Sequence, residues 1–286
     1  MFLSWNQGKR SIVIDLTTES GQAELHRLVA TADAVIENFR PGVSERLGCD
    51  RATLLAVNPD LVFLSSPGYG LDPSMAARPA FDPLAQALGG FMAAQGGLAT
   101  TGDGSEPVFL SVPVHDVTTP LLGAFGVVLG WWQRGRADHA SDDAGSAGDG
   151  TPSGRGQHIR TSLIQSTMVA QAAEFTRYQG REQPALGGFD HPGVDGDTWA
   201  ERDDGRLIWT SGPHQVEVET YGLTHSPLAR ANGLVVEQDS TGFGPLTVFG
   251  QLVGGAGPPL SPAPDLGQHR EEIRTDAMQG SRSRGQ

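Results

Sequence analysis

A single carboxylate, that of Asp116, lies in the otherwise uncharged stretch 110–132 (LSVPVHDVTTPLLGAFGVVLGWW). It is the only acid between Glu106 and Asp138. An aspartate here can cap a following helix by accepting hydrogen bonds from backbone N–H groups two or three residues further on. It can also attack an activated acyl carbon as a nucleophile. Capping bonds stabilise the carboxylate and weaken it as a nucleophile, so the two roles compete. Residue type and position alone favour the cap.

The elements expected around Asp116 are a strand over 110–114, a turn at His115–Asp116, and a helix with Pro120 in its first turn, where no N–H is needed. His115 is expected to point away from Asp116 and to be a poor partner for it. Glycines near one side of the helix would let another backbone come close. They are Gly123, Gly126 and Gly130.

Cations occur beside the other expected strands. They are Lys9 and Arg10 before the first, Arg40 in the turn Asn38–Phe39–Arg40 after the second, and Arg46 one short helix later. Loops at the carboxyl ends of parallel strands are where such sheets bind ligands, and a phosphorylated ligand would need cations here. Basic residues on loops are also common as solvated surface charges, and spacing alone favours that simpler interpretation.

Composition and missing motifs exclude several classes of site. The net charge of −13 argues against nucleic-acid binding, which needs basic stripes. The single cysteine, Cys49, excludes a disulfide framework or cysteine-rich metal site and indicates a reducing compartment. The eight histidines show no metal-ligand spacing, and neither a phosphate-binding GxxxxGK[ST] nor a GxSxG motif occurs. No apolar run approaches the roughly 20 residues of a membrane span. We therefore expect a cytoplasmic protein with no metal and no membrane contact.

Alternating strands and helices predict an α/β fold with a parallel, Rossmann-like sheet in the first half of the chain. The strands are expected at 11–16, 34–37, 61–65 and 158–163, and the helices between the first three at 22–31 and 51–57. The second half turns rich in Gly, Pro and Asp.

These shifts in composition divide the chain into four predicted segments. We predict a partial large domain over 1–180, with a flexible insertion at 135–156, and a reduced small domain over 187–245. We further expect a C-terminal segment, 246–277, that returns to the large domain, and a disordered tail at 278–286.

Several motifs, in this order and spacing, resemble those of the family III CoA-transferases, the CaiB/BaiF family. The resemblance is specific through about Ser166 and patchy beyond it. Its motifs are NQGKRSI at 6–12, VIENFRPG at 35–42, GYG at 68–70, RPAFDPLAQ at 78–86, the Asp116 unit, and GRGQH at 154–158, with a weaker PDLGQH at 264–269.

The resemblance implies that Asp116 is the catalytic carboxylate. It would attack an acyl-CoA thioester to give a mixed anhydride, and CoA would return to form an aspartyl-CoA thioester. An incoming carboxylic acid would then be activated by the reverse steps. Asp82 matches an acidic position close to that nucleophile, and we include it among the catalytic residues.

The same resemblance implies a binding site for coenzyme A, supplied as the acyl-CoA substrate. The residues expected to hold it are Lys9, Arg10, Asn38, Phe39, Arg40 and Arg46. The family also contains α-methylacyl-CoA racemases, in which a histidine precedes the aspartate matched by Asp82. Phe81 occupies that position here and cannot take a proton, so transfer is favoured over racemisation.

Comparison with the family pattern implies three departures. The family's first strand–helix unit is expected to be missing before Met1, the insertion at 136–154 is longer than usual, and the region 187–245 is shorter than the family's small domain. Because the family forms interlocked dimers, we expect a homodimer or a hetero-oligomer with a related chain. The chain could instead be a non-catalytic CoA-binding subunit of a split or duplicated transferase.

Overall fold

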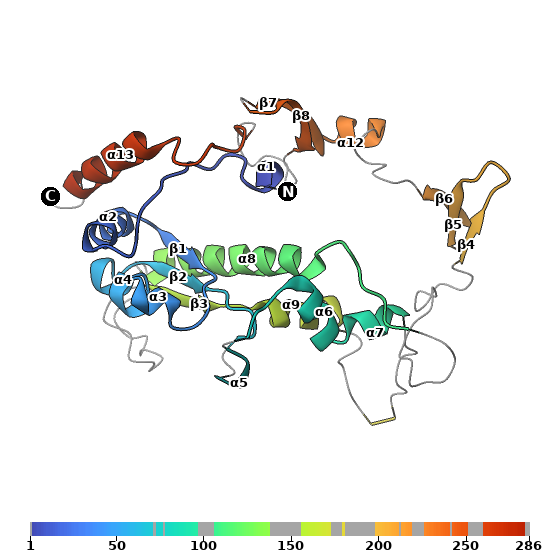
Figure 1. The fold of residues 1–286 in the computed structure, drawn as a ribbon, viewed down its shortest axis with the longest axis horizontal. Coiled ribbons are helices and arrows are strands. Elements are labelled where there is room, and N and C mark those ends of the chain that lie inside the picture. The colour runs from blue at the N-terminus through green and yellow to red at the C-terminus, as the bar shows by residue number, and fades with distance from the viewer. Residues whose placement is uncertain are drawn as a thin grey trace. The chain divides into compact units, whose positions relative to one another are not determined.

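The computed structural model describes residues 2–70, 73–76, 78–96, 106–137, 156–172, 179–180, 198–211, 213–218, 226–240, 242–250 and 260–283. Its contacts divide the chain into two units (Figure 1). The parallel-sheet unit comprises Ile14–Gly188 and Ala277–Gln286, and the hairpin unit comprises Met1–Val13 and Phe189–Asp276. Each unit is described by itself below.

The parallel-sheet unit is built on strands β1 (Ala34–Glu37), β2 (Val62–Ser65) and β3 (Gln157–Arg160), in the order β1-β2-β3. Both pairings are parallel and in register, so that Glu37, Ser65 and Arg160 form one row across the sheet. The predicted α/β fold with a parallel sheet is confirmed for this unit. Its helices are α2 (Glu19–Val29), α3 (Val43–Arg46), α4 (Arg51–Val57), α5 (Pro73–Ala76), α6 (Asp82–Leu88), α7 (Phe91–Gly96), α8 (Val114–Ala137) and α9 (Leu163–Ala170).

The two faces of this sheet are covered by different helices (Figure 1). On one face a buried apolar cluster joins α2 and α4 to β2, through Val29, Leu54, Leu55 and Phe63 among others. On the other face α8 lies against the strands, and its glycines face strand side chains. The absence of side chains on one side of α8 is therefore what lets this helix approach the sheet.

Alanine substitution at two glycines of α8 tests how closely this helix approaches the sheet. A Cβ at Gly126 would lie 2.6 Å from Cγ2 of Ile159, whereas one at Gly130 would lie 3.1 Å from Cγ1 of Val62. Overpacking costs about 1–3 kcal/mol, against a gain of about 1 kcal/mol in helix propensity. We expect Gly126→Ala to lower the free energy of unfolding by about 1 kcal/mol more than Gly130→Ala, measured by urea denaturation. Equal effects would contradict this packing.

The hairpin unit contains two antiparallel sheets. Strands β4 (Thr198–Glu201), β5 (Leu207–Ser211) and β6 (His214–Val218) form one, and β7 (Val235–Ser240) with β8 (Gly244–Phe249) forms the other. Helices α1 (Phe2–Trp5) and α12 (Pro227–Ala231) also belong to it, and α13 (Arg270–Ser283) begins there.

The predicted strand over 11–16 is absent, since residues 9–15 have no regular secondary structure. Backbone groups of this segment bond elsewhere: Ser11 O accepts from His269 N at 3.0 Å, and Asp15 O accepts from Thr18 N at 3.3 Å. A β-branched run forms a strand only when a partner strand satisfies its backbone groups. The boundary between the two units falls within this segment, at Val13 and Ile14.

The domain boundaries also differ from the predicted ones. The predicted break between 245 and 246 would cut strand β8, which pairs with β7 along its whole length. Residues 246–276 therefore stay with the hairpin unit. The first residues join it too, because the Trp5 and Phe249 rings pack 5.2 Å apart and Gln7 Nε2 donates to Phe249 O at 3.0 Å.

The prediction of a disordered tail is wrong, and most of the predicted insertion is not tested. Helix α13 continues to Ser283, contrary to the disorder predicted from residue 278. Residues 135–137 of the predicted insertion end α8, and 138–155 lie outside the described residues. Among the helices that the structure describes, none combines the length and apolar character required to cross a bilayer.

Candidate active site

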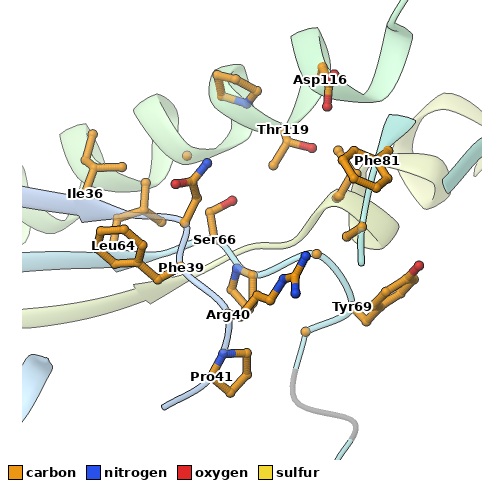
Figure 2. A pocket seen from close by; sticks show the side chains of 18 of the residues that line it. Ile36, Phe39, Arg40, Pro41, Leu64, Ser66, Tyr69, Phe81, Asp116 and Thr119 are labelled. Carbon is orange, nitrogen blue, oxygen red and sulfur yellow. The ribbon is translucent and has the colours of Figure 1, made fainter. Parts of the chain in front are cut away.

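A cavity of about 550 Å³ lies in the parallel-sheet unit, between α8 and the loops that follow β1 and β2. Figure 2 shows Asp116 and Thr119 on α8 at one side of it, with Phe39 and Arg40 across from them. The cavity therefore lies at the carboxyl ends of parallel strands, where α/β sheets bind their ligands. Its lining brings together four predicted site residues, Asn38, Phe39, Arg40 and Asp116.

The local structure at Asp116 differs from the expected strand and turn. Residues 106–113 form no strand, and α8 begins at Val114, which makes Asp116 its third residue rather than its cap. Pro120 consequently lies inside the helix, beyond the first turn. The predicted strand over 110–114 and the predicted place of Pro120 are both wrong.

Asp82, the first residue of α6, caps α8 in place of Asp116. Asp82 as a whole residue is 3% exposed, and its Oδ2 accepts from the backbone N–H of His115 at 2.7 Å and of Asp116 at 3.0 Å. Its other oxygen, Oδ1, accepts from Nε2 of Gln86. Gln86 is held in turn by hydrogen bonds in both directions with the backbone of Leu110. The free N–H groups at the start of α8 are thus satisfied by a carboxylate from another helix.

Because Asp82 performs the capping, the Asp116 carboxylate is left available. Asp116 is exposed, and no described residue donates a hydrogen bond to its side chain. Its pKa is raised, chiefly by partial burial and then by the charge of Asp82, while His115 acts in the opposite direction. A raised pKa makes the ionised carboxylate more basic. Capping is therefore performed by Asp82, and the Asp116 carboxylate is free of that role.

His115 does not line the cavity. Its side chain is fully buried and packs edge-on against the ring of Phe91 at 5.3 Å. Burial lowers the pKa of its imidazole, against the opposing charges of Asp82 and Asp116. The imidazole therefore packs against Phe91 and takes no part in the cavity wall.

The remaining predicted cations lie elsewhere. Arg46 ends α3 and does not line this cavity. Lys9 and Arg10 belong to the hairpin unit. There the Lys9 ammonium donates to Asn6 Oδ1 at 3.1 Å, and Arg10 forms ion pairs with Glu272 at 3.0 Å and Asp276 at 2.6 Å.

Several lining residues were not predicted. Thr119 and Gly123 follow Asp116 at intervals of three and seven residues, so the spacing of one helix face could have identified them. Tyr69 and Arg78 also line the cavity, and the Tyr69 hydroxyl donates to Pro79 O at 2.8 Å. Within the described ranges, no group of three or more His, Cys, Asp or Glu side chains is placed to hold a metal ion.

The sequence model of CoA-transferase family III matches residues 1–218. The chain belongs to CoA-transferase family III. The CaiB/BaiF resemblance of the motifs is therefore confirmed, and the Asp116 cavity lies within the matched region.

Named relatives agree with this assignment. The chain is 34% identical over 199 residues to a succinyl-CoA:mesaconate CoA-transferase of Haloarcula hispanica, which covers 67% of this chain and 44% of the relative. It is 33% identical over 209 residues to a succinate–glutarate CoA-transferase of Agrobacterium fabrum, covering 72% of this chain and 47% of the relative. The chain thus spans less than half the length of these relatives.

A CaiB/BaiF family protein from Brucella suis has the same fold. Its crystal structure superposes with a TM-score of 0.75 at 22% identity, covering 96% of this chain and 83% of that one. At this identity the likeness supports the fold alone.

Proposed function

We propose that this chain transfers CoA from an acyl-CoA to a carboxylic acid, with Asp116 as the nucleophile. The observation that carries the proposal is the Asp116 carboxylate at the cavity wall, exposed and relieved of capping by Asp82. Membership of CoA-transferase family III supports the same reaction. We propose Asp82 as a positioning residue, because its buried carboxylate holds the backbone of Asp116 and does not line the cavity.

In the first half of the proposed reaction, a carboxylate oxygen of Asp116 attacks the thioester carbonyl carbon. The C–S bond breaks, and the products are a mixed anhydride and the CoA thiolate. That thiolate then attacks the Asp116 carbonyl carbon of the anhydride. The donor acid leaves as a carboxylate, and Asp116 carries CoA as a thioester.

The second half runs the same steps in reverse with a different acid. The incoming carboxylate attacks the carbonyl carbon of the aspartyl-CoA thioester and expels the CoA thiolate. The thiolate attacks the acyl carbon of the new anhydride, which releases the new acyl-CoA and restores the Asp116 carboxylate. No proton transfer is needed, which agrees with a cavity whose reacting group is a lone carboxylate.

We assign binding of the CoA substrate to Asn38, Phe39 and Arg40, which line the cavity on the loop after β1. Glu37 fixes the start of this loop, because its Oε2 accepts from Phe39 N at 2.8 Å. Lys9, Arg10 and Arg46 remain predicted CoA ligands outside this cavity.

A transfer assay tests the proposal. Purified protein is incubated with acetyl-CoA or succinyl-CoA and a panel of oxalate, succinate, glutarate and mesaconate, which are acids or acyl groups named in the relatives. We expect a new acyl-CoA from at least one donor–acid pair. A folded protein that forms none of them would contradict catalysis by this chain alone.

That negative result would favour the second candidate function, a CoA-binding subunit that needs a related chain. The observation behind it is a relative from Chloroflexus aurantiacus, 32% identical over 165 residues, that is named as the beta subunit of a succinyl-CoA–L-malate CoA-transferase. We propose a homodimer or hetero-oligomer as the active form.

We propose a cytoplasmic location, because the chain has a single cysteine, Cys49.

The raised pKa of Asp116 predicts the pH dependence of transfer. Attack requires the ionised carboxylate, so kcat/KM is expected to fall as the pH drops through the pKa of Asp116. Because partial burial and Asp82 raise that pKa, the acid limb should lie above the ordinary range of an aspartate, about 3.9. Steady-state rates from pH 3 to 8 check this, and an acid limb at or below about 3.9 would contradict it.

A further inference from the structure

Two arginines share the wall of the Asp116 cavity with the proposed nucleophile. Among the described residues that line this cavity, the charged ones are Arg40, Arg78 and Asp116. Both arginines are exposed, and neither side chain forms an ion pair or hydrogen bond with any residue that the structure describes. The chain as a whole has a net charge of −13, so this excess of positive charge is local. Such a wall favours an anionic ligand.

The two arginines differ in what else they line. Arg40 directly follows Asn38 and Phe39, with which it is assigned to the CoA substrate, and it also lines a neighbouring cavity of about 610 Å³. Arg78 lines the Asp116 cavity but not that neighbour. It has no role in the mechanism above. Arg78 is therefore the cation of this wall whose ligand is still to be assigned.

The loop that carries Arg78 is held against the loop after β2 by two contacts. The Tyr69 hydroxyl donates to Pro79 O at 2.8 Å. Gly68 packs so closely on Ala80 that a Cβ at Gly68 would overlap with the Cβ of Ala80. These contacts fix the backbone on the carboxyl side of Arg78, so its side chain extends from a defined place on the cavity wall.

The same segment leads directly to the group that positions the nucleophile. Asp82 follows Arg78 four positions along the chain, and its carboxylate accepts from Asp116 N at 3.0 Å. The cavity wall also has apolar side chains, which include Leu64 and Phe81. It thus offers a reacting carboxylate, an apolar surface for a carbon chain, and a guanidinium group for a second anionic group on the same ligand.

The charge of this wall changes during the proposed reaction. Asp116 is negative in the free protein but has no charge once it carries CoA as a thioester. The charges that then remain on the described wall are those of Arg40 and Arg78, and both are positive. An incoming acid with two carboxylates brings one to react at Asp116 and a second that can pair with an arginine. Arginine binds carboxylates through paired N–H groups.

We propose that Arg78 binds the distal carboxylate of a dicarboxylic substrate, so that dicarboxylic acids and their CoA thioesters are the substrate class. The inference rests on the proposed CoA transfer. Because the second half of that reaction reverses the first, the donor acyl group and the incoming acid occupy the same place in turn. One arginine therefore selects both. The distal carboxylate is bound by Arg78 and takes no part in bond making.

Reaction with a matched pair of thioesters tests this specificity. Succinyl-CoA and butyryl-CoA differ only in carrying a carboxylate or a methyl group at the far end of the acyl chain. The rate of adduct formation is measured for each on the full chain, by hydroxylamine trapping and intact-mass spectrometry. The wild type should react with succinyl-CoA faster by about tenfold or more. Arg78→Gln should lower the succinyl-CoA rate by about tenfold and leave the butyryl-CoA rate within about twofold.

Two further variants separate recognition of the carboxylate from general effects of the substitution. Arg78→Lys keeps the charge but not the paired N–H groups, so it should retain part of the preference for succinyl-CoA. Arg27→Gln makes the same change of charge at an exposed position on α2 that does not line the cavity. It should leave both rates unchanged.

The failures of the two proposals are distinguishable. A wild type that reacts equally with both thioesters would overturn the specificity and leave the transfer intact. An equal loss of both rates in Arg78→Gln would also overturn it, because Arg78 would then bind a group common to both thioesters, such as a CoA phosphate. A folded wild type that forms no adduct with either thioester would overturn the transfer, and the specificity with it.

Discussion

Asp116→Asn is expected to abolish CoA transfer, with a loss in kcat of at least about a thousandfold. The amide cannot form the mixed anhydride, and nothing else on the described cavity wall is a carboxylate that could replace it. Because Asp116 is exposed and its side chain makes no hydrogen bond with a described residue, the substitution should alter stability by no more than about 0.5 kcal/mol.

The measurement combines steady-state transfer with urea denaturation of the same preparation. Thr119→Val is the matched control on the same helix face. It changes a cavity-lining residue whose hydroxyl donates to His115 O at 2.7 Å, without touching the proposed nucleophile. We expect it to keep transfer within about tenfold of the wild type. If Asp116→Asn retained comparable activity, the nucleophile would have to be sought elsewhere.

Asp82→Ala is expected to have the largest effect on stability, a loss of about 2–4 kcal/mol in the free energy of unfolding. The buried N–H groups of His115 and Asp116 would lose their acceptor, and Gln86 would lose its partner as well. Chemical denaturation at neutral pH measures this. A loss below about 1 kcal/mol would show that water or backbone groups replace the carboxylate.

Asp82→Asn separates positioning from stability. An amide oxygen can still accept from the two N–H groups, so the variant should fold, but the negative charge that raises the pKa of Asp116 is gone. We therefore expect the acid limb of kcat/KM to move to lower pH, together with a loss in kcat of about tenfold to a hundredfold. An unchanged acid limb would contradict electrostatic coupling of the two aspartates.

The parallel sheet could be predicted from the sequence because its signals are local. The strand at 34–37 has the predicted bounds, and β2 and β3 begin within a residue of the predicted starts. The first two are short apolar or β-branched runs, whereas β3 has the polar sequence QHIR. The expected strand at 11–16 resembles the first two in composition, yet its backbone bonds to residues near 269. Composition does not reveal whether a partner strand is present.

Four residues that line the cavity could be predicted from the sequence, but the geometry around them could not. Asp116 stood out as an isolated acid, and the family motifs identified its neighbours Asn38–Arg40. Its local role was misjudged because the true cap, Asp82, lies 34 positions earlier in the chain. Such a long-range contact leaves no trace in the residues next to Asp116.

The most direct test of the account is intact-mass spectrometry of the purified protein after incubation with acetyl-CoA or succinyl-CoA, followed by hydroxylamine. Hydroxylamine cleaves an enzyme-bound anhydride or thioester and leaves a hydroxamate on the carboxylate. We predict a mass shift that maps by peptide analysis to Asp116 and is absent from Asp116→Asn. A shift at another residue, or none in a folded protein, would contradict Asp116 as the nucleophile of this chain.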